Sequence, residues 1–165
     1  MNIIDAHIHF YDTPNFDLLA EQAHHQNTAE HLEQEFRRLG IQGAVVMGNG
    51  SLEPNAHIYP SFMRYCVNLD HQCFARDQSQ RCIDLVEQHL RRRECVGIKF
   101  YPGYQPFYIY DDVCRPYLEL AASYHKPVAI HTGETAGRHS LLQYCHPLTL
   151  DKAAGEHPDV EFVMC

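Results

Sequence analysis

Polar and apolar side chains alternate along the first ten residues of the chain. Because successive side chains of a β-strand point to opposite faces, Asp5, His7 and His9 are expected to share one face. Ile4 and Ile8 are expected on the other face, packed against hydrocarbon. The pattern therefore predicts an amino-terminal strand with ligand-type side chains on one side only.

Farther along, short apolar runs alternate with segments of helical periodicity. Continuous apolar runs bounded by Gly or Pro predict buried strands, and apolar positions spaced three or four residues apart predict helices. Strands are expected at residues 43–47, 65–70, 96–101, 127–132 and 160–165. Helices are expected at residues 17–39 (in one or two pieces, ending at Gly40), 79–93, 111–124 (capped by Asp111 or Asp112), 140–144 and 148–154.

This order of elements predicts an α/β fold with a parallel sheet covered on both faces. A doubly wound open sheet and a (β/α) barrel are the two candidates. A glycine-rich phosphate loop, typical of open nucleotide-binding sheets, does not follow the first strand. Eight-unit barrels have about 250 residues, so six strands in 165 residues fit part of one. We predict a single domain over residues 1–165: a partial (β/α)8 TIM barrel, C-terminally incomplete.

Three histidines are expected at the same end of this barrel. Side chains at the carboxyl ends of barrel strands meet at one mouth, where active sites are built. His7 and His9 end the first strand, and alternation within residues 127–132 turns His131 inward. Because imidazole nitrogen is a common ligand of transition metals, these three side chains are candidate ligands of one divalent ion.

A lysine is also expected inside the barrel. Alternation within residues 96–101 turns Val96 toward the helices and Lys99 toward the interior. A buried ammonium is costly without compensation, which leaves three interpretations, in this order. Lys99 forms an ion pair with Asp5 or Glu134, anchors a substrate carboxylate, or is a carbamylated metal ligand.

The loops after the strands say less about specificity. Residues 51–61 and 101–109 are rich in tyrosine and proline. With Tyr101 and Tyr104, they are expected to line a mouth that receives a planar or apolar small molecule.

The net charge of the chain limits the kinds of molecule it is expected to bind. The formal net charge is −8, with 21 acidic and 13 basic residues. Nucleic acids and acidic membranes require clustered Lys and Arg, and the only basic run, Arg91 to Arg93, is expected to end a helix, where cations favour the negative end of the helix dipole. We expect a small-molecule substrate and neither a nucleic-acid nor a membrane partner.

Cysteines and histidines add little chemistry beyond this. Seven cysteines occur without a Cys-x-x-Cys pair, and no signal peptide precedes the first strand, which predicts free thiols and a cytoplasmic location. No apolar run reaches the roughly 20 residues that span a bilayer. Most of the 13 histidines, His57 and His89 among them, are expected at the surface.

Five segments, in this order along the chain, together resemble a known family. They are residues 4–9 (IDAHIH), 97–102 (GIKFYP), 127–133 (PVAIHTG), 147–151 (PLTLD) and 158–165 (PDVEFVMC). The set resembles the amidohydrolase superfamily, and within it the amidohydrolase-related branch of metal-dependent TIM-barrel hydrolases, which also contains decarboxylases.

This resemblance implies a metal-dependent hydrolase. The metal, most often zinc, would be held by His7, His9 and His131 and would activate water to attack a C–N or C–O bond of a small molecule. Asp5 would support the ligands on its strand. Lys99 and Asp5 are therefore the candidate catalytic side chains.

The departures from the family pattern suggest alternatives. That pattern continues with a histidine after strand six and an aspartate after strand eight, and the 165 residues contain neither. We therefore expect weak metal binding and little turnover from this chain. The alternatives are a decarboxylase that grips a carboxylate with Lys99 or Arg138, and an inactive fragment that serves as a binding or assembly module. Unpaired edges on the first and last strands predict self-association as a homo-oligomer.

Overall fold

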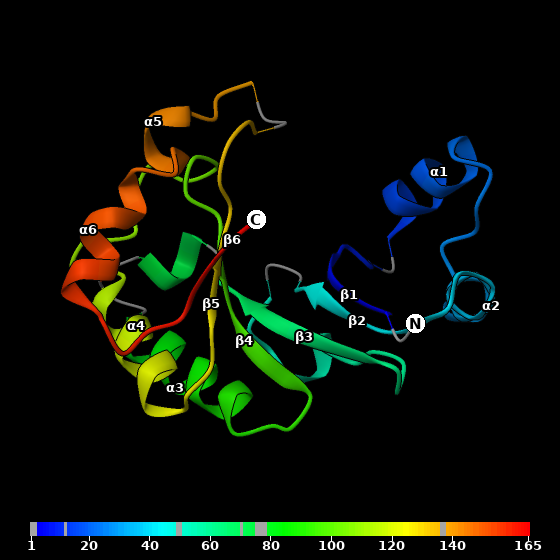
Figure 1. The fold of residues 1–165 in the computed structure, drawn as a ribbon, viewed down its shortest axis with the longest axis horizontal. Helices are drawn as coiled ribbons and strands as arrows, with labels where there is room; N and C mark the ends of the chain where they lie inside the picture. Colours follow the sequence, from blue (N-terminus) through cyan, green and yellow to red (C-terminus); the bar gives the residue numbers. More distant parts are fainter. Residues whose placement is uncertain (1–2, 12, 49–50, 70, 75–78, 136–137) are drawn as a thin grey trace.

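Six parallel strands form one curved sheet in chain order (Figure 1). The computed structural model describes residues 3–11, 13–48, 51–69, 71–74, 79–135 and 138–165. The strands are β1 (Ile3–Ile8), β2 (Ile41–Met47), β3 (Met63–Asn68), β4 (Cys95–Phe100), β5 (Val128–Ile130) and β6 (Phe162–Met164). Each strand pairs in parallel with the next. The sheet is a half-barrel, which confirms the predicted fold class.

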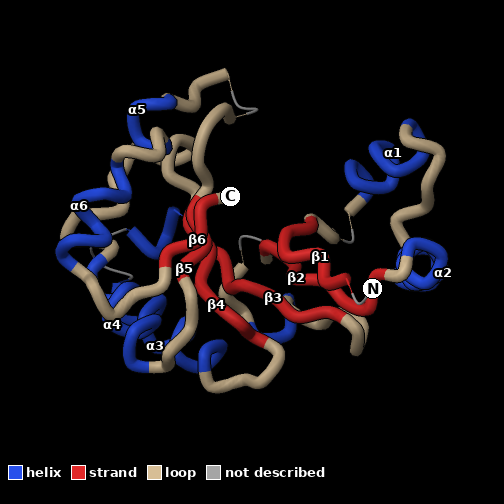
Figure 2. Tube along the Cα trace, in the orientation of Figure 1, coloured by secondary structure: helices blue, strands red, loops and turns tan. Residues whose placement is uncertain are grey.

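The helices lie outside this sheet (Figure 2). They are α1 (Pro14–Gln22), α2 (Ala29–Leu39), α3 (Ser79–Leu90), α4 (Arg115–Ser123), α5 (Leu142–Cys145) and α6 (Thr149–Glu156), with short 3-10 turns η1 (Pro54–Ala56) and η2 (His71–Phe74). In Figure 1, α1 and α2 lie beside β1 and β2, while the later helices lie beside β3 to β6. In its described residues, the connection from β2 to β3 contains only η1.

Two apolar layers, one on each side of the sheet, hold the fold together. The larger layer lies between sheet and helices, where Ile98, Val128 and Ile130 pack with helical residues such as Val86 and Leu118. Each fully buried aliphatic side chain of this kind contributes roughly 1.5–3 kcal/mol. The smaller layer lies on the inner face and contains Met47, Cys66 and Ala129. The predicted alternation within β5 is therefore confirmed.

The alternation predicted for β4 is wrong at its first residues. Val96 packs with the inner layer instead of facing the helices. The register shifts between Tyr65 and Cys66, which pair with Cys95 and Gly97, so that Val96 has no partner in the ladder. Such a bulge inserts one extra residue and reverses the side-chain alternation that precedes it. Farther along β4, the alternation is as predicted.

The boundaries of two helices also differ from the prediction. Helix α3 ends at Leu90, so Arg91 to Arg93 lie in the turn that follows it. Helix α4 begins after Cys114 rather than at an aspartate cap. Asp111 instead accepts a hydrogen bond from the Tyr108 backbone N–H at 2.9 Å, and Asp112 pairs with Arg115 at 2.6 Å. Local partners therefore occupy both carboxylates.

The segment 17–39 forms two helices, one of the two forms predicted. Helix α2 ends at Gly40, whose φ of 74° is the left-handed conformation that glycine adopts without strain. Thr28 caps its first turn by accepting a hydrogen bond from the His31 backbone N–H at 3.2 Å. The helix turns Phe36 inward, where its ring packs edge-on against Phe62.

The predicted aliphatic face of β1 is only partly packed. Ile8 contacts the larger apolar layer, but Ile4 is 68% exposed. Within the described sheet, β1 pairs only with β2 and has no strand on its other side, so fewer neighbours reach its first residues. The predicted strand residues Met1, Asn2 and Asp70 lie outside the described part of the chain. None of the described helices combines the length and apolar character that crossing a membrane requires.

Candidate metal and substrate site

The predicted site residues lie on the inner side of the half-barrel, at the carboxyl ends of β1, β4 and β5. His7 lies in β1, and His9 follows the strand directly. Their ring centroids are 5.2 Å apart and the ring planes meet at 68°. The alternation of β1 therefore brings the two imidazoles together, as expected.

Asp5 contacts this pair through the backbone. Its carboxylate accepts a hydrogen bond from the His7 backbone N–H at 3.1 Å. No hydrogen bond joins Asp5 to the imidazole of His7 or His9 in the described part of the chain. Asp5 thus fixes the chain at His7 instead of orienting the ring.

Tyr11 holds His9, and it was not singled out from the sequence. Its hydroxyl lies 2.9 Å from the carbonyl oxygens of both Met47 and Gly48, and 3.2 Å from Nδ1 of His9. A phenol has a single proton, which it donates to the carbonyls, so the phenol oxygen accepts from the Nδ1–H of His9. Nε2 of His9 then keeps a free lone pair. The polar alternation of β1, continued by two residues, would have identified Tyr11.

Lys99 is fully buried in β4, with an exposed fraction of 0%. Its ammonium has no hydrogen-bond partner among the described residues, and lies 4.9 Å from the centroid of the Tyr101 ring. The predicted ion pair with Asp5 or Glu134 does not form, because neither carboxylate reaches the ammonium. Glu134 is exposed on its loop. Of the three interpretations of Lys99, the first is therefore wrong.

His131 follows β5 and has a buried Nε2 that no described group contacts by a hydrogen bond. Tyr101 stacks near its ring at a centroid distance of 6.2 Å, and Tyr104 meets it edge-on at 5.1 Å. The two tyrosines thus flank His131, as expected of residues that line the mouth. Arg138, the alternative carboxylate grip, is exposed.

Asn68 is a second polar residue that the sequence did not single out. It ends β3, directly beside Lys99 in the strand register. Its Oδ1 is buried without a hydrogen-bond partner among the described residues. Buried polar atoms nearly always have partners, so the unpartnered atoms of Asn68, Lys99 and His131 make this face of the sheet a candidate ligand site.

Comparison with known proteins agrees with this geometry. The family model described as amidohydrolase matches residues 4–165. The chain belongs to the amidohydrolase family. No curated protein matched the sequence.

Solved structures show that this amidohydrolase half-barrel corresponds to part of a TIM barrel. 2,6-Dihydroxybenzoate decarboxylase from Rhizobium superposes with a TM-score of 0.63 at 15% identity, over 98% of this chain and 65% of that one. 5-Carboxyvanillate decarboxylase from Novosphingobium aromaticivorans, with bound manganese, gives 0.60 at 12%, over 98% and 64%. An amidohydrolase from Bifidobacterium longum subsp. infantis gives 0.58 at 17%, over 99% and 60%. The amidohydrolase chain thus spans about two thirds of these structures or less.

Burial and the charge of Lys99 favour the neutral form of the imidazoles of this amidohydrolase. Burial, followed by the positive charge of Lys99, lowers the pKa of His7, His9 and His131. Burial also lowers the pKa of Lys99 itself, against an opposing effect of the Cys165 thiol. A neutral imidazole is the form that binds a metal.

The imidazole nitrogens of the amidohydrolase site are suitable ligands for a divalent metal. The Nε2 of His131 is buried without a partner, and Tyr11 leaves Nε2 of His9 unprotonated. Within the described ranges, no three His, Cys, Asp or Glu side chains converge closely enough to form a metal-binding group. His7 and His9 therefore lie close together, and His131 lies on the same inner face. The three imidazoles are not close enough in this structure to form a metal-binding group.

Proposed function

We propose that this chain carries the metal-binding part of a metal-dependent enzyme that acts on a small carboxylic acid. His7, His9 and His131 would hold the metal, and Lys99 would bind the substrate carboxylate. The observation that carries the proposal is the buried, unpartnered ammonium of Lys99 on the inner face that also bears the unpartnered Nε2 of His131.

The need for a counter-charge supports an anionic substrate. A buried ammonium without a partner costs free energy that a carboxylate would offset. Neither Asp5 nor Glu134 supplies that carboxylate, so the substrate would do so. Asn68, next to Lys99 in the register, would hydrogen-bond the same group or a neighbouring one.

The donor set supports a transition metal. Three neutral imidazoles suit zinc, and also manganese or iron in sites with additional oxygen ligands. When bound, the metal would lower the pKa of water and polarise a carbonyl or carboxyl group. Zinc is our first choice because all three proposed ligands are nitrogen atoms. One relative of the same fold was solved with manganese.

The reaction we propose is hydrolysis of a C–N or C–O bond in a small acid. In this reaction, Lys99 would bind and orient the substrate, while Asp5 and Tyr11 would position the backbone of His7 and the ring of His9. We treat residues 1–165 as one structural unit of that enzyme. Self-association through the edges of β1 and β6 remains a prediction.

Decarboxylation is the second candidate, and Lys99 favours it specifically. A lyase of this kind must hold the carboxylate that leaves, and a buried cation without a protein partner is suited to that purpose. Two relatives of the same fold are named as decarboxylases of substituted benzoates. In those names the substrates are small aromatic acids, the class that Tyr101 and Tyr104 would accommodate.

The test is a substrate panel assayed with zinc and with manganese. Release of CO₂ from hydroxybenzoates would identify the lyase, and ring opening of lactones or cleavage of amides that carry a carboxylate would identify the hydrolase. We expect Lys99→Met to raise KM for the acid by at least tenfold, with no such change for a neutral ester of the same compound.

Two results would contradict the proposal. One is turnover of acid substrates whose KM is the same in Lys99→Met as in the wild type. The other is an absence of both binding and turnover for every acid in the panel with either metal, which would favour the third prediction, a binding or assembly module.

A further inference from the structure

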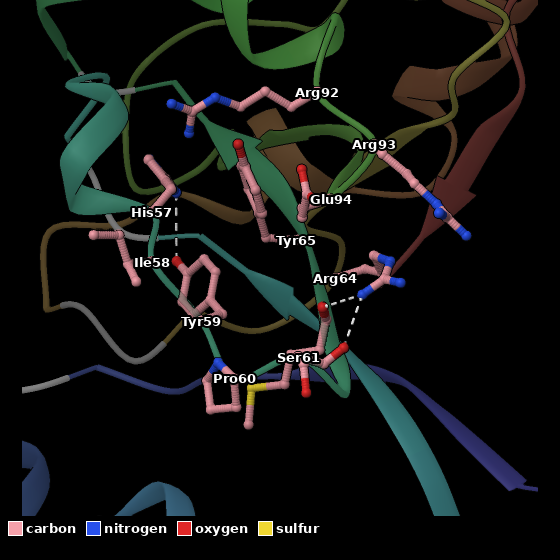
Figure 3. Close-up of a pocket in the computed structure, with 11 residues that line it drawn as sticks. His57, Ile58, Tyr59, Pro60, Ser61, Arg64, Tyr65, Arg92, Arg93 and Glu94 are labelled. Carbon is pink, nitrogen blue, oxygen red and sulfur yellow. Dashed lines mark hydrogen bonds between the residues drawn. The ribbon is translucent and has the colours of Figure 1, made fainter.

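A second hollow lies at the opposite ends of the strands, away from the site described above. It encloses about 490 Å³ and is lined by the first residues of β3 and by the turn that precedes β4 (Figure 3). Its lining includes three arginines, Arg64, Arg92 and Arg93, but a single carboxylate, Glu94. This concentration of positive charge contrasts with the net charge of −8 of the whole chain.

The three guanidinium groups have no carboxylate partner in the part of the chain that the structure describes. Among the described residues, the ion pairs of the chain involve other cations. Arg64 donates from Nη1 to the carbonyl oxygens of Ser61 and Met63, at 3.1 and 2.8 Å. Arg92 donates from Nη1 to the carbonyl oxygen of Pro54 at 3.1 Å. These bonds fix the side chains without neutralising their charge.

The wall that carries Arg92 and Arg93 is rigidly held. Lys126 donates from Nζ to the carbonyl oxygens of Leu90, Arg92 and Cys95, all within 3.0 Å. This triple contact fixes the turn between α3 and β4 from its far side. Arg91, the neighbour of the pair, is occupied elsewhere by Glu87 and Tyr124. The backbone that carries Arg93 is therefore held in place by the hydrogen bonds from Lys126.

Aromatic and aliphatic side chains form the rest of the lining. Tyr65 and His57 stack at a centroid distance of 4.9 Å, and both are buried. Tyr59 approaches His57 through its hydroxyl, 3.4 Å from Nδ1. In Figure 3, Arg92 lies on one side of this aromatic group, and Arg64 and Arg93 lie on the other. The accessible apolar surface comes from Ile58, which is 79% exposed, and from the half-buried Tyr59 and Pro60, beside the cationic donors.

We propose that this hollow, which we call the arginine pocket, binds a small organic oxyanion with an aromatic or other flat apolar part. Its lining residues are those of the pocket in Figure 3. Guanidinium groups recognise carboxylate and phosphate through paired N–H···O bonds, and the volume is that of a small-ligand site. The inference does not depend on the proposed function, because none of the metal or substrate residues lines the pocket.

The test measures binding of three probes to the whole chain by calorimetry or by chemical-shift titration: phenyl phosphate, benzoate and inorganic phosphate. We expect phenyl phosphate or benzoate to bind more tightly than inorganic phosphate. Arg93→Gln should weaken binding about tenfold, and Arg64→Gln combined with Arg93→Gln should abolish it. Arg115→Gln, which changes an exposed arginine on α4, is the matched control and should leave binding unchanged.

The single variant Arg93→Gln keeps the test informative if the Arg64 change disturbs the start of β3. Two results would overturn the proposal. One is the absence of binding of all three probes at 10 mM, roughly the weakest binding that counts as specific here. The other is a loss of binding in Lys99→Met with none in Arg93→Gln, which would place the probe at the opposite end of the strands.

Discussion

Two groups of buried polar atoms in this molecule have opposite hydrogen-bonding states. At the outer side of β3, His57 and His89 are 5% and 0% exposed, and each has both ring nitrogens near a partner. His89 lies 2.7 Å from the Tyr65 hydroxyl and 2.9 Å from the Leu52 carbonyl oxygen. His57 lies 2.6 Å from the Ser51 carbonyl oxygen and 3.4 Å from the Tyr59 hydroxyl.

At the inner face, Nε2 of His131, Nζ of Lys99 and Oδ1 of Asn68 have no such partners in the described part of the chain. A network in which every polar atom is hydrogen-bonded stabilises the fold. Buried polar groups without partners lower the free energy of unfolding, and they are retained where a ligand supplies the missing hydrogen bonds. The comparison therefore separates histidines with a structural hydrogen-bond network from the histidine that we propose binds a ligand.

The largest effect should come from removing a structural histidine. His89→Ala leaves a cavity and exposes two buried polar atoms, on Tyr65 and Leu52, to an apolar surrounding. We expect a loss of about 3–4 kcal/mol in the free energy of unfolding, measured by urea denaturation. His131→Ala is the comparison variant and should cost less than about 1 kcal/mol. Equal losses in the two variants would contradict the distinction.

Acid should destabilise the fold by protonating the buried histidines His57 and His89. Burial lowers the pKa of His57 to about 4. The hydrogen bond to Ser51 opposes this shift, and the positive charges of His89 and Arg92 add to it. Burial lowers the pKa of His89 as well. In the unfolded chain these imidazoles titrate near 6.5, so the unfolded state binds more protons between the two values. Stability is therefore complete above pH 6.5 and falls as the pH drops toward 4.

One pKa unit corresponds to about 1.4 kcal/mol, so His57 alone accounts for a loss of up to about 3 kcal/mol across this range. Thermal or urea unfolding at pH 7 and pH 4.5 measures it. His57→Gln should flatten the pH dependence. A wild-type stability that does not change between these pH values would show that His57 is not held neutral by the fold.

The fully buried Lys99 and the half-buried Lys126 should respond in opposite directions to the same substitution. Lys99→Met removes an unpartnered ammonium and should stabilise the fold by about 2 kcal/mol. Lys126→Met removes hydrogen bonds to three carbonyl groups and should destabilise it by about 2 kcal/mol. Unfolding curves of both variants, recorded without added metal or acid, make the comparison. Destabilisation by Lys99→Met would mean that Lys99 has a structural partner.

The smallest effect should come from the residue that orients a proposed ligand. Tyr11→Phe removes the oxygen that accepts from the Nδ1–H of His9, so the imidazole can rotate or change its tautomer. We expect about a tenfold loss of metal affinity, or about 1.4 kcal/mol, in competition with a chromophoric chelator. Tyr110→Phe, outside the site, should change nothing. If both variants bind metal as tightly as the wild type, Tyr11 does not orient His9.

Local patterns predicted most of the fold but not the fate of these histidines. Alternation in β1 and β5 placed His7, His9 and Ala129 correctly, because side-chain direction in a strand depends on near neighbours alone. His57 and His89 were expected at the surface. They are buried by contacts with Tyr65 and Leu52, 8 and 37 positions away, which no periodicity encodes.

Two other errors have the same origin. The bulge that turns Val96 inward depends on how β4 pairs with β3. The missing ion pair of Lys99 depends on where Asp5 and Glu134 lie in space. In each case the contacting residue belongs to another element. The residue type and its spacing along the chain were therefore insufficient to predict the contact.

The most direct test of the distinction between the two groups is the stoichiometry of metal binding, measured by isothermal titration with zinc and with manganese. The account predicts one site per chain, lost in His7→Ala and His131→Ala and retained in His31→Ala, which alters a half-buried histidine of α2 whose Nε2 lies 3.0 Å from Nδ1 of His25. The contrary result would be a site that survives His131→Ala, or one that disappears in His31→Ala.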